Sequence, residues 1–310
     1  MTGTGASGDL APDQAAAPTE PIVPVRQSRW HRLRNDPRIT KQLVIGLTLF
    51  LGIVVFSIVA PSLVDPANGN YGAVTPRLSP NFEHPLGTDT QGQDLWTTLA
   101  LGTGNTLRMG LIAGFVGVSV GLVLALIAGF FSGWSDTTIR LISDALLTVP
   151  GLAILVIIAA NVEQMTVEIM ALTVALLAWM FPTRTIRAQV LTIRQRSYVE
   201  VARANGVGNW SLIFKEVMPN LMPFVFASFV GAVAGAMLAV IGLEALGLGA
   251  DDAHTLGVSI YWSQEFAAVL RGMWWWWLPP ILMIGAIFIS LFLISAGTDR
   301  FANPRLRHSA

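Results

Sequence analysis

The sequence predicts an all-α integral membrane protein with six transmembrane helices, and two observations lead to this prediction. Of the 310 residues, 53% are hydrophobic and only 12% are charged, whereas a soluble domain carries about 25% charged residues. The apolar residues also gather into long runs, each near the length of about 20 residues that a helix needs to cross a bilayer. The predicted spans cover residues 43–64, 106–131, 139–160, 165–182, 220–246 and 278–297.

The composition argues against several classes of function. Basic and acidic residues number 19 each, and this balance argues against nucleic acid as a partner. Without cysteine there is no disulfide framework, thiolate nucleophile or iron–sulfur site. The four histidines, at positions 31, 84, 254 and 308, are too scattered in the sequence for a local metal motif. We therefore expect neither a metal site nor catalytic residues.

A nucleotide-binding P-loop is also missing from the sequence. That motif requires a lysine followed by Ser or Thr after a glycine-rich stretch, because the lysine reaches the terminal phosphates. The two lysines, Lys41 and Lys215, follow Thr40 and Phe214 rather than the glycine that the motif requires. We expect the chain to bind no cofactor and any ATP to be hydrolysed elsewhere.

Residues 1–40 are predicted to be a disordered cytoplasmic tail. Residues 1–24 are rich in Ala, Pro, Gly, Thr and Asp and lack apolar periodicity. They also lack the basic start and apolar core of a secretory signal, so no cleavage is expected. Six basic residues from Arg26 to Lys41 precede the first span, and we interpret them as an anchor of topology.

The basic residues set the expected orientation. All of them except Arg77, Arg108 and Arg271 lie before the first span, just after the connection between the second and third spans (Arg140), in residues 184–215 or at the C-terminus. Positively charged residues remain in the cytoplasm. Both termini and the polar segment between the fourth and fifth spans are therefore expected on the cytoplasmic side.

The long loop between the first two spans is predicted to lie outside. Residues 90–100 are expected to form a short separate helix, capped by Thr88 with Gln91 at the matching position of a capping box. We interpret the loop as a lid or brace, in preference to a catalytic role for Asp89 or Asp94.

Three acidic residues lie within or near the predicted spans. An ionisable group at membrane depth is a candidate for function. Asp144 lies near the cytoplasmic end of the third span, where a packing role is favoured, and Glu168 opens the fourth span. Glu244 lies near the outer end of the fifth span, and two interpretations stay open for it: a place near a translocation path, or solvation at the interface.

Residues 195–219 form a polar stretch between the fourth and fifth predicted spans, called the 195–219 segment below. Ser197 and Glu200 have the spacing of a capping box, which predicts a helix over 198–205. Gly206 follows where a left-handed residue would end that helix.

A second short helix is predicted after this glycine. Asn209 can cap a helix over 210–218, and Pro219 is expected to end it. Two short helices joined at a glycine elbow would form a compact unit between two membrane spans.

The pattern E-x-A-R-A-x-G followed by I-F-K-x-x-x-P-N resembles the cytoplasmic coupling loop of ABC importer permeases of the oligopeptide/dipeptide group. The runs HPLGTD in the loop and TDRFANPRLR at the C-terminus resemble the same group. Four positions depart from the group's pattern: Gln93, Thr106, Val201 and Glu216. The resemblance covers residues 40–307 and implies a type I permease domain over 41–307. Carried over by position, the motif's coupling residues are Glu200, Ala202, Ala204, Gly206 and Pro219.

This resemblance implies a set of partners and a location. The partners are a homologous permease chain, two ATPase subunits that hold ATP and Mg, an extracytoplasmic substrate-binding protein, and the lipid bilayer. The implied location is the bacterial cytoplasmic membrane. The implied mechanism is alternating access, with a path formed between the two permease chains.

The cargo stays open between peptides and oligosaccharides. Trp274 to Trp277 precede the sixth span, where Pro279 and Pro280 are expected in the first helical turn. These tryptophans fit an aromatic belt at the membrane interface, or a surface that stacks on sugar rings. The candidate path residues are Glu244, Trp274 and Trp275.

Two rival interpretations are weaker. A secondary transporter driven by an ion gradient would give a use to the intramembrane acids, but the sequence shows no inverted repeat or paired broken helices. A purely structural membrane subunit explains neither the 195–219 segment nor the long loop.

Overall fold

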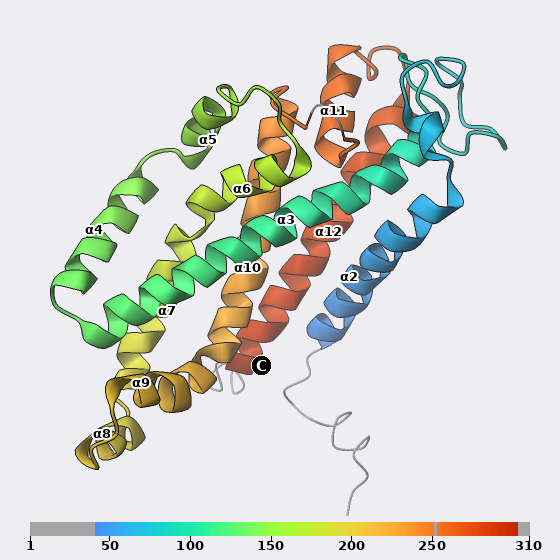
Figure 1. Cartoon of the computed structure of the whole chain (residues 1–310). Coiled ribbons are helices and arrows are strands. Elements are labelled where there is room, and N and C mark those ends of the chain that lie inside the picture. Colours follow the sequence, from blue (N-terminus) through green and yellow to red (C-terminus); the bar gives the residue numbers. More distant parts are fainter. Residues whose placement is uncertain (1–40, 251–252, 303–310) are drawn as a thin grey trace, which may run out of the picture. The chain divides into compact units, whose positions relative to one another are not determined.

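A computed structural model describes residues 41–250 and 253–302 of the chain. Regular structure within these ranges is helical (Figure 1), apart from an isolated bridge between Thr88 and Asp94. The predicted tail, residues 1–40, and the C-terminal residues 303–307 that resemble the permease group lie outside the described residues. The prediction of an all-α membrane protein is confirmed.

Within the described residues, four helices are each long and apolar enough to cross a membrane. Two further pairs of helices are bent, and if each pair counts as one span the number of spans is six. The single spans are Lys41–Leu63, Leu95–Phe131, Asn209–Ala245 and Trp274–Thr298.

The first two spans are joined by the loop of residues 64–94. Helix α2 (Lys41–Val59) continues into the 3-10 turn η1 (Ala60–Leu63), and a second 3-10 turn, η2 (Pro66–Gly69), follows in the loop. Helix α3 (Leu95–Leu126) then runs into a π-helical turn, η3 (Ile127–Phe131).

The prediction of a separate short helix over 90–100 is wrong, because α3 starts at Leu95 and runs on without a break. Asp94 caps it: its carboxylate accepts the N–H of Thr97 at 3.0 Å and the hydroxyl of the same residue at 2.7 Å. Thr88 makes hydrogen bonds within the loop instead, to Leu78 and Thr75. The helix begins where a carboxylate satisfies its unpaired N–H groups.

The third predicted span, 139–160, is broken. Helices α4 (Trp134–Thr148) and α5 (Gly151–Ala159) meet at 81°. Pro150 is the cause, because a residue that precedes proline is excluded from the helical region. Val149 accordingly adopts an extended conformation, with φ −82° and ψ 135°.

The fourth predicted span, 165–182, is also bent and extends further than expected. Helices α6 (Val167–Ala178) and α7 (Met180–Arg194) meet at 42°. Pro182 lacks the N–H that would bond to the carbonyl of Ala178, four residues earlier, so the helix bends between the two.

The remaining elements lead to the last span. They are α8 (Ser197–Ala204), α9 (Asn209–Leu212), the π-helical turn η4 (Ile213–Val217), α10 (Met218–Ala245), α11 (Leu256–Glu265) and α12 (Trp274–Ala302). Helix α11 is absent from the predicted spans because it is too short and too polar to cross a membrane. The predicted start of the sixth span at residue 278 is wrong, because α12 begins at Trp274. The two prolines, Pro279 and Pro280, therefore lie inside the helix.

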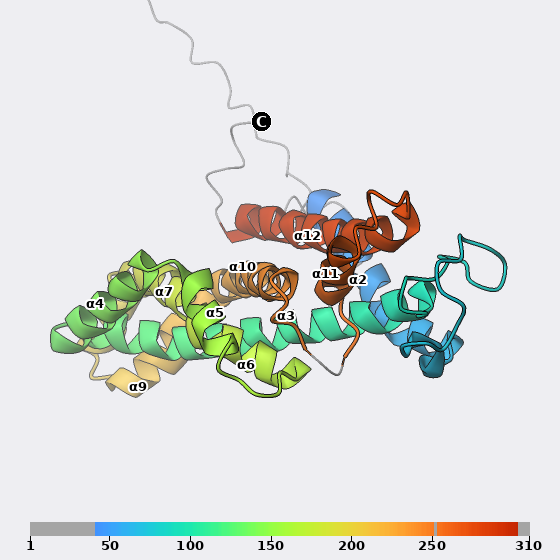
Figure 2. The same ribbon diagram turned by 90° about the horizontal axis from the view of Figure 1, so that it is seen from above.

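Helix α3 packs along α10 and α6, as both views show (Figures 1 and 2). Glycines permit this close approach. A Cβ atom built on Gly114 would lie 2.5 Å from Val233 Cγ2 of α10, and one on Gly117 would lie 2.6 Å from the Cβ of Ala178 at the end of α6. Small residues let helix backbones approach closely where lipid offers no hydrophobic drive for association.

The absence of cysteine allows a direct test of the orientation. Single cysteines at exposed Thr137 and Asn209 should react with a membrane-impermeant maleimide only after the membrane is permeabilised, because the distribution of positive residues predicts that these regions are cytoplasmic. Cysteines at exposed Glu83 and Leu270 should react in intact cells. Labelling of the Asn209 position in intact cells would overturn the expected orientation.

Candidate functional site

The 195–219 segment contains α8 and α9 and lies at the ends of α3 and α7 (Figure 1). Helix α8 starts at Ser197, and the carbonyl of Arg196 accepts the N–H groups of Val199 and Glu200 at 3.0 and 3.1 Å. No side chain caps this helix, so the predicted capping box of Ser197 and Glu200 is wrong. Ser197 is already inside the first turn, where its hydroxyl is not placed to accept the N–H groups ahead of it.

The elbow after α8 is confirmed. Gly206 has a φ of +81°. Its N–H donates to the carbonyl of Arg203 at 3.0 Å, and the N–H of Val207 donates to the carbonyl of Ala202 at 3.2 Å. This pair of bonds is the Schellman motif, in which a left-handed glycine ends a helix and satisfies its last carbonyls.

The second half of the segment differs from the prediction. Asn209 is the first residue of α9 and does not cap it, and Pro219 does not end a helix. Instead α9, η4 and α10 form one continuous helix of 37 residues, from Asn209 to Ala245. Pro219 falls in the first turn of α10, directly after a π-helical turn in which Met218 N–H donates to the carbonyl of Ile213, five residues back. The wider turn changes the hydrogen-bond register where the proline lacks its donor.

One face of the segment is packed and the other is open. Val199, Leu212, Ile213 and Val217 are buried against α3 and α7. On the open face several large apolar side chains are exposed: Tyr198 (41%), Val201 (60%), Trp210 (66%) and Phe214 (57%). Such an apolar patch on a polar segment is typical of an interaction surface.

The predicted coupling residues are mostly on the open face. Glu200, Ala204, Gly206 and Pro219 are exposed, and Ala202 is half-buried. These five residues thus lie within one contiguous segment, next to the exposed apolar side chains.

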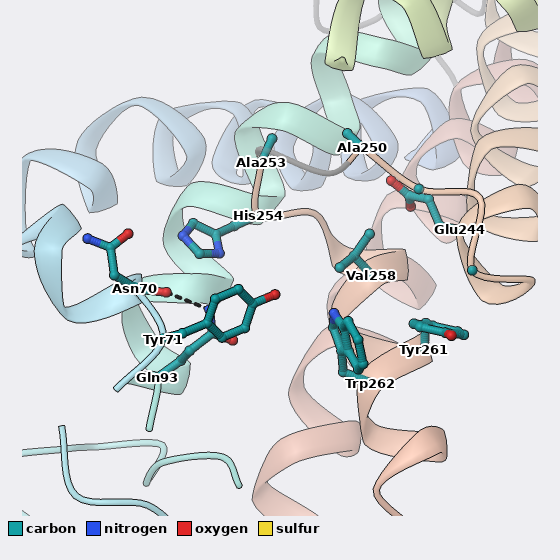
Figure 3. A pocket seen from close by; sticks show the side chains of 13 residues that line it. Asn70, Tyr71, Gln93, Glu244, Ala250, Ala253, His254, Val258, Tyr261 and Trp262 are labelled. Carbon is teal, nitrogen blue, oxygen red and sulfur yellow. Dashed lines mark hydrogen bonds between the residues drawn. The ribbon is translucent and has the colours of Figure 1, made fainter. Parts of the chain in front are cut away.

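At the other end of α10 lies a cavity of about 310 Å³, the Glu244 cavity (Figure 3). Residues from three parts of the chain line it: Asn70 and Tyr71 after η2, Glu244 at the end of α10, and His254, Tyr261 and Trp262 from the α11 region. Asn105 Nδ2 donates to the carbonyl of His254 at 2.8 Å and holds that region against α3.

Glu244 is fully buried, and neither carboxylate oxygen has a hydrogen-bond partner among the described residues. A Cβ atom built on Gly257 would lie 2.1 Å from Glu244 Oε2, so the carboxyl group packs directly on the α11 backbone. The interpretation that Glu244 is solvated at the interface is therefore wrong for this conformation.

The other two intramembrane acids have basic neighbours. Glu168 lies 2.8 Å from Arg108, and Asp144 lies 3.9 Å from Arg184. All four side chains are about half exposed or more, and such pairs contribute little to stability. Glu244 differs from both in being buried and unpaired.

Burial shifts the pKa values of two groups that line the cavity, His254 and Tyr71, and both shifts favour the neutral form. Burial lowers the pKa of His254 below its ordinary value. Burial, with a contribution from the charge of Asp89, raises the pKa of the Tyr71 phenol. Asp89 itself accepts the N–H groups of Gln91 and Gln93, both at 2.8 Å, and holds the loop turn. These bonds give Asp89 a structural role within the loop.

The tryptophan run does not line the Glu244 cavity. Trp274 is 51% exposed, and Trp275 Nε1 donates to the carbonyl of Thr88 at 3.4 Å. Trp276 is buried and stacks on Phe266, which in turn stacks on Trp262, with ring centroids 6.1 and 5.7 Å apart. The structure thus places Trp274 and Trp275 apart from Glu244, and Trp262 beside the same cavity as Glu244.

The candidate path residues did not include four residues that line this cavity: Tyr71, His254, Tyr261 and Trp262. Residues 259–266, SIYWSQEF, are rich in aromatic side chains, which is a signal for Tyr261 and Trp262. No signal in the sequence placed Tyr71 and His254 beside them, because that contact depends on the folded chain.

The family described as "Binding-protein-dependent transport system inner membrane component" matches residues 121–308. The glutathione transport system permease protein GsiD of Pectobacterium atrosepticum is 29% identical over 56% of this chain and 57% of its own length. A putative peptide transport system permease protein of Brucella suis is 29% identical over 85% of this chain and 88% of its own. The dipeptide transport system permease protein DppC of Bacillus subtilis is 25% identical over 95% of this chain and 90% of its own length.

The elbow can be tested with two matched glycines. Gly206→Val should speed amide hydrogen exchange in α8, because a β-branched residue at positive φ costs about 1–3 kcal/mol. No atom lies within 4 Å of a Cβ built on either Gly206 or Gly208, and Gly208 has a φ of −67°. Gly208→Val is therefore the control and should leave exchange unchanged. Equal effects of the two variants would contradict the left-handed elbow.

The tryptophan run can be tested by comparing neighbours. Trp276→Ala should lower the free energy of unfolding by about 3–5 kcal/mol, because it empties a packed site. Trp274→Ala should change it by less than about 0.5 kcal/mol, because the side chain is exposed. Thermal denaturation of the purified variants in one detergent measures both, and equal losses would contradict the observed packing.

Proposed function

We propose that this chain and a homologous permease chain together form the path along which peptides cross the membrane. The chain belongs to the binding-protein-dependent transport system inner membrane component family and is a permease subunit of an ABC importer. Support for peptides as cargo comes from the relatives, whose names include peptide and dipeptide transport. The oligosaccharide alternative rested on the aromatic residues 259–266 and on the tryptophan run; Trp262 lines the Glu244 cavity, whereas Trp274 and Trp275 lie outside it.

We infer that the open face of the 195–219 segment binds an ATPase subunit. The exposed apolar side chains offer a surface that loses contact with water on binding. The exposed carboxylate of Glu200 in the same segment offers a charge for a basic partner residue. ATP and Mg would be held by that partner, so this chain itself would catalyse no reaction.

The observation that carries this proposal is the continuous helix from Asn209 to Ala245. It joins the binding surface at one end to the Glu244 cavity at the other, over about 55 Å at 1.5 Å per residue. A displacement of α9 by the ATPase subunits would therefore be transmitted along α10. The π-helical turn η4 is where this helix would adjust, since such turns often occur at functional sites.

The mechanism is alternating access between two states of the membrane helices. ATP binding to the partner subunits would favour one state, and delivery of solute by a substrate-binding protein would favour uptake from the outside. This assignment places the 195–219 segment and both termini in the cytoplasm and the chain in a bacterial cytoplasmic membrane. An ion-gradient-driven transporter receives no support from the family match.

Substitution of Glu200 tests the coupling. Glu200→Ala should reduce both uptake and solute-stimulated ATPase activity of the assembled transporter, because loss of a charge contact between subunits costs about 2–5 kcal/mol. Glu83→Ala removes another exposed glutamate, from the loop after α2, and should leave both activities unchanged. Uptake is compared at equal amounts of protein in the membrane, and normal transport by Glu200→Ala would contradict the assignment.

A further inference from the structure

We propose that the Glu244 cavity binds the ammonium group of the transported solute, with the buried carboxylate of Glu244 as the counter-ion and Tyr261 and Trp262 beside it. This inference rests on the proposed function and narrows its substrate class to solutes that carry a primary amine, such as peptides with a free N-terminus.

The first argument is that the buried carboxylate of Glu244 lacks a compensating positive charge. Glu244 is fully buried and has no ion-pair partner among the described residues, and no hydrogen bond of good geometry reaches either carboxylate oxygen there. The hydroxyl of Thr255 and the N–H of Gly257 lie near the carboxylate, but neither carries a positive charge that would balance it. An ionised carboxylate removed from water is strongly unfavourable without a compensating charge. The group therefore needs either a proton or a cation.

The second argument is the charge of the cavity walls. Neither lysine nor arginine is among the described lining residues, and burial shifts the pKa values of His254 and Tyr71 in the directions that favour their neutral forms. Glu244 is thus the single lining group in the described part of the chain that can bring a charge near pH 7, and that charge is negative. Such walls favour a cation and disfavour a phosphate, a sulfate or a free carboxylate.

The third argument is the aromatic content of the walls. Tyr71, Tyr261 and Trp262 enter the cavity from two sides, and Figure 3 shows their rings around the space below Val258. Ring faces attract ammonium groups through their quadrupole. A volume of about 310 Å³ lies at the lower end of the range for small-molecule sites, which suits one end of a peptide rather than a whole long chain.

In the described conformation, solvent does not reach the Glu244 carboxylate. The Glu244 side chain has no exposed surface, and the carboxyl group packs on Gly257. An ammonium group would reach it when α10 and the start of α11 separate. Glycine at position 257 leaves the carboxylate room at this contact, whereas any side chain there would displace it.

The experiment measures binding directly, without the substrate-binding protein, which selects solutes on its own. The transporter, purified with its partner permease and ATPase subunits, is dialysed against radiolabelled trialanine, N-acetyl-trialanine or maltotriose. The wild type should bind trialanine, and removal of the positive charge by acetylation should weaken binding at least about tenfold. Glu244→Gln keeps the shape of the side chain and should weaken trialanine binding at least about tenfold, with little change for N-acetyl-trialanine.

Two further variants make the result specific. Glu265→Gln removes an exposed carboxylate from the same helix, α11, and should bind trialanine as the wild type does. Trp262→Leu should weaken trialanine binding by about fivefold through loss of the ring. The yield and melting temperature of each assembled complex show that the variant has folded.

Three outcomes would overturn the proposal: wild-type transporter that binds no trialanine, equal binding of trialanine and its acetylated form, or a Glu244→Gln variant that binds trialanine normally. Equal weakening of all probes by Glu244→Gln would also overturn it, because a protonated packing residue would behave in that way. A transporter that still couples ATP hydrolysis to import in any of these cases leaves the proposed function standing.

Discussion

The structure depends on keeping one helix continuous from Asn209 to Ala245 although Pro219 and Pro223 lie within it. In a bilayer, backbone groups without a partner are costly, so a spanning segment must satisfy its hydrogen bonds internally. The π-helical turn η4 supplies the change of register just before Pro219. This continuity gives the 195–219 segment a rigid connection to the Glu244 cavity. The same constraint produces breaks elsewhere, since Pro150 and Pro182 each interrupt a span without such a compensating turn.

Close packing around α3 holds that helix in place. Glycines of α3 face Val233 and Met237 of α10, so the two backbones approach more closely than larger side chains would allow. Tight packing between helices transmits displacement, because packed interiors have few voids and deform little. Motion at the 195–219 segment would therefore move α10 together with its neighbours, which suits a protein that alternates between two arrangements.

The distribution of charge separates structural from functional acids. Asp94 caps α3, Asp89 holds a loop turn, and Glu168 lies beside Arg108, so each has local partners. Glu244 has none, and it is placed where the loop, α10 and α11 meet. An unpaired buried carboxylate reduces stability, and it is best understood as a group whose partner arrives with the solute. The aromatic residues beside it agree with a cationic partner.

Local sequence signals by themselves determined the helical membrane fold, the family resemblance and the left-handed Gly206, because hydrophobic length, motif letters and glycine geometry are properties of neighbouring residues. Only the tertiary structure decided that α3 starts at Leu95, that the third and fourth spans bend, and that helix α9 joins α10. It also decided that Glu244 is buried beside Trp262 rather than solvated. These outcomes depend on contacts between residues distant in the chain, such as Asn105 with His254 and Gly257 with Glu244. Periodicity and composition carry no information about which distant segments will meet.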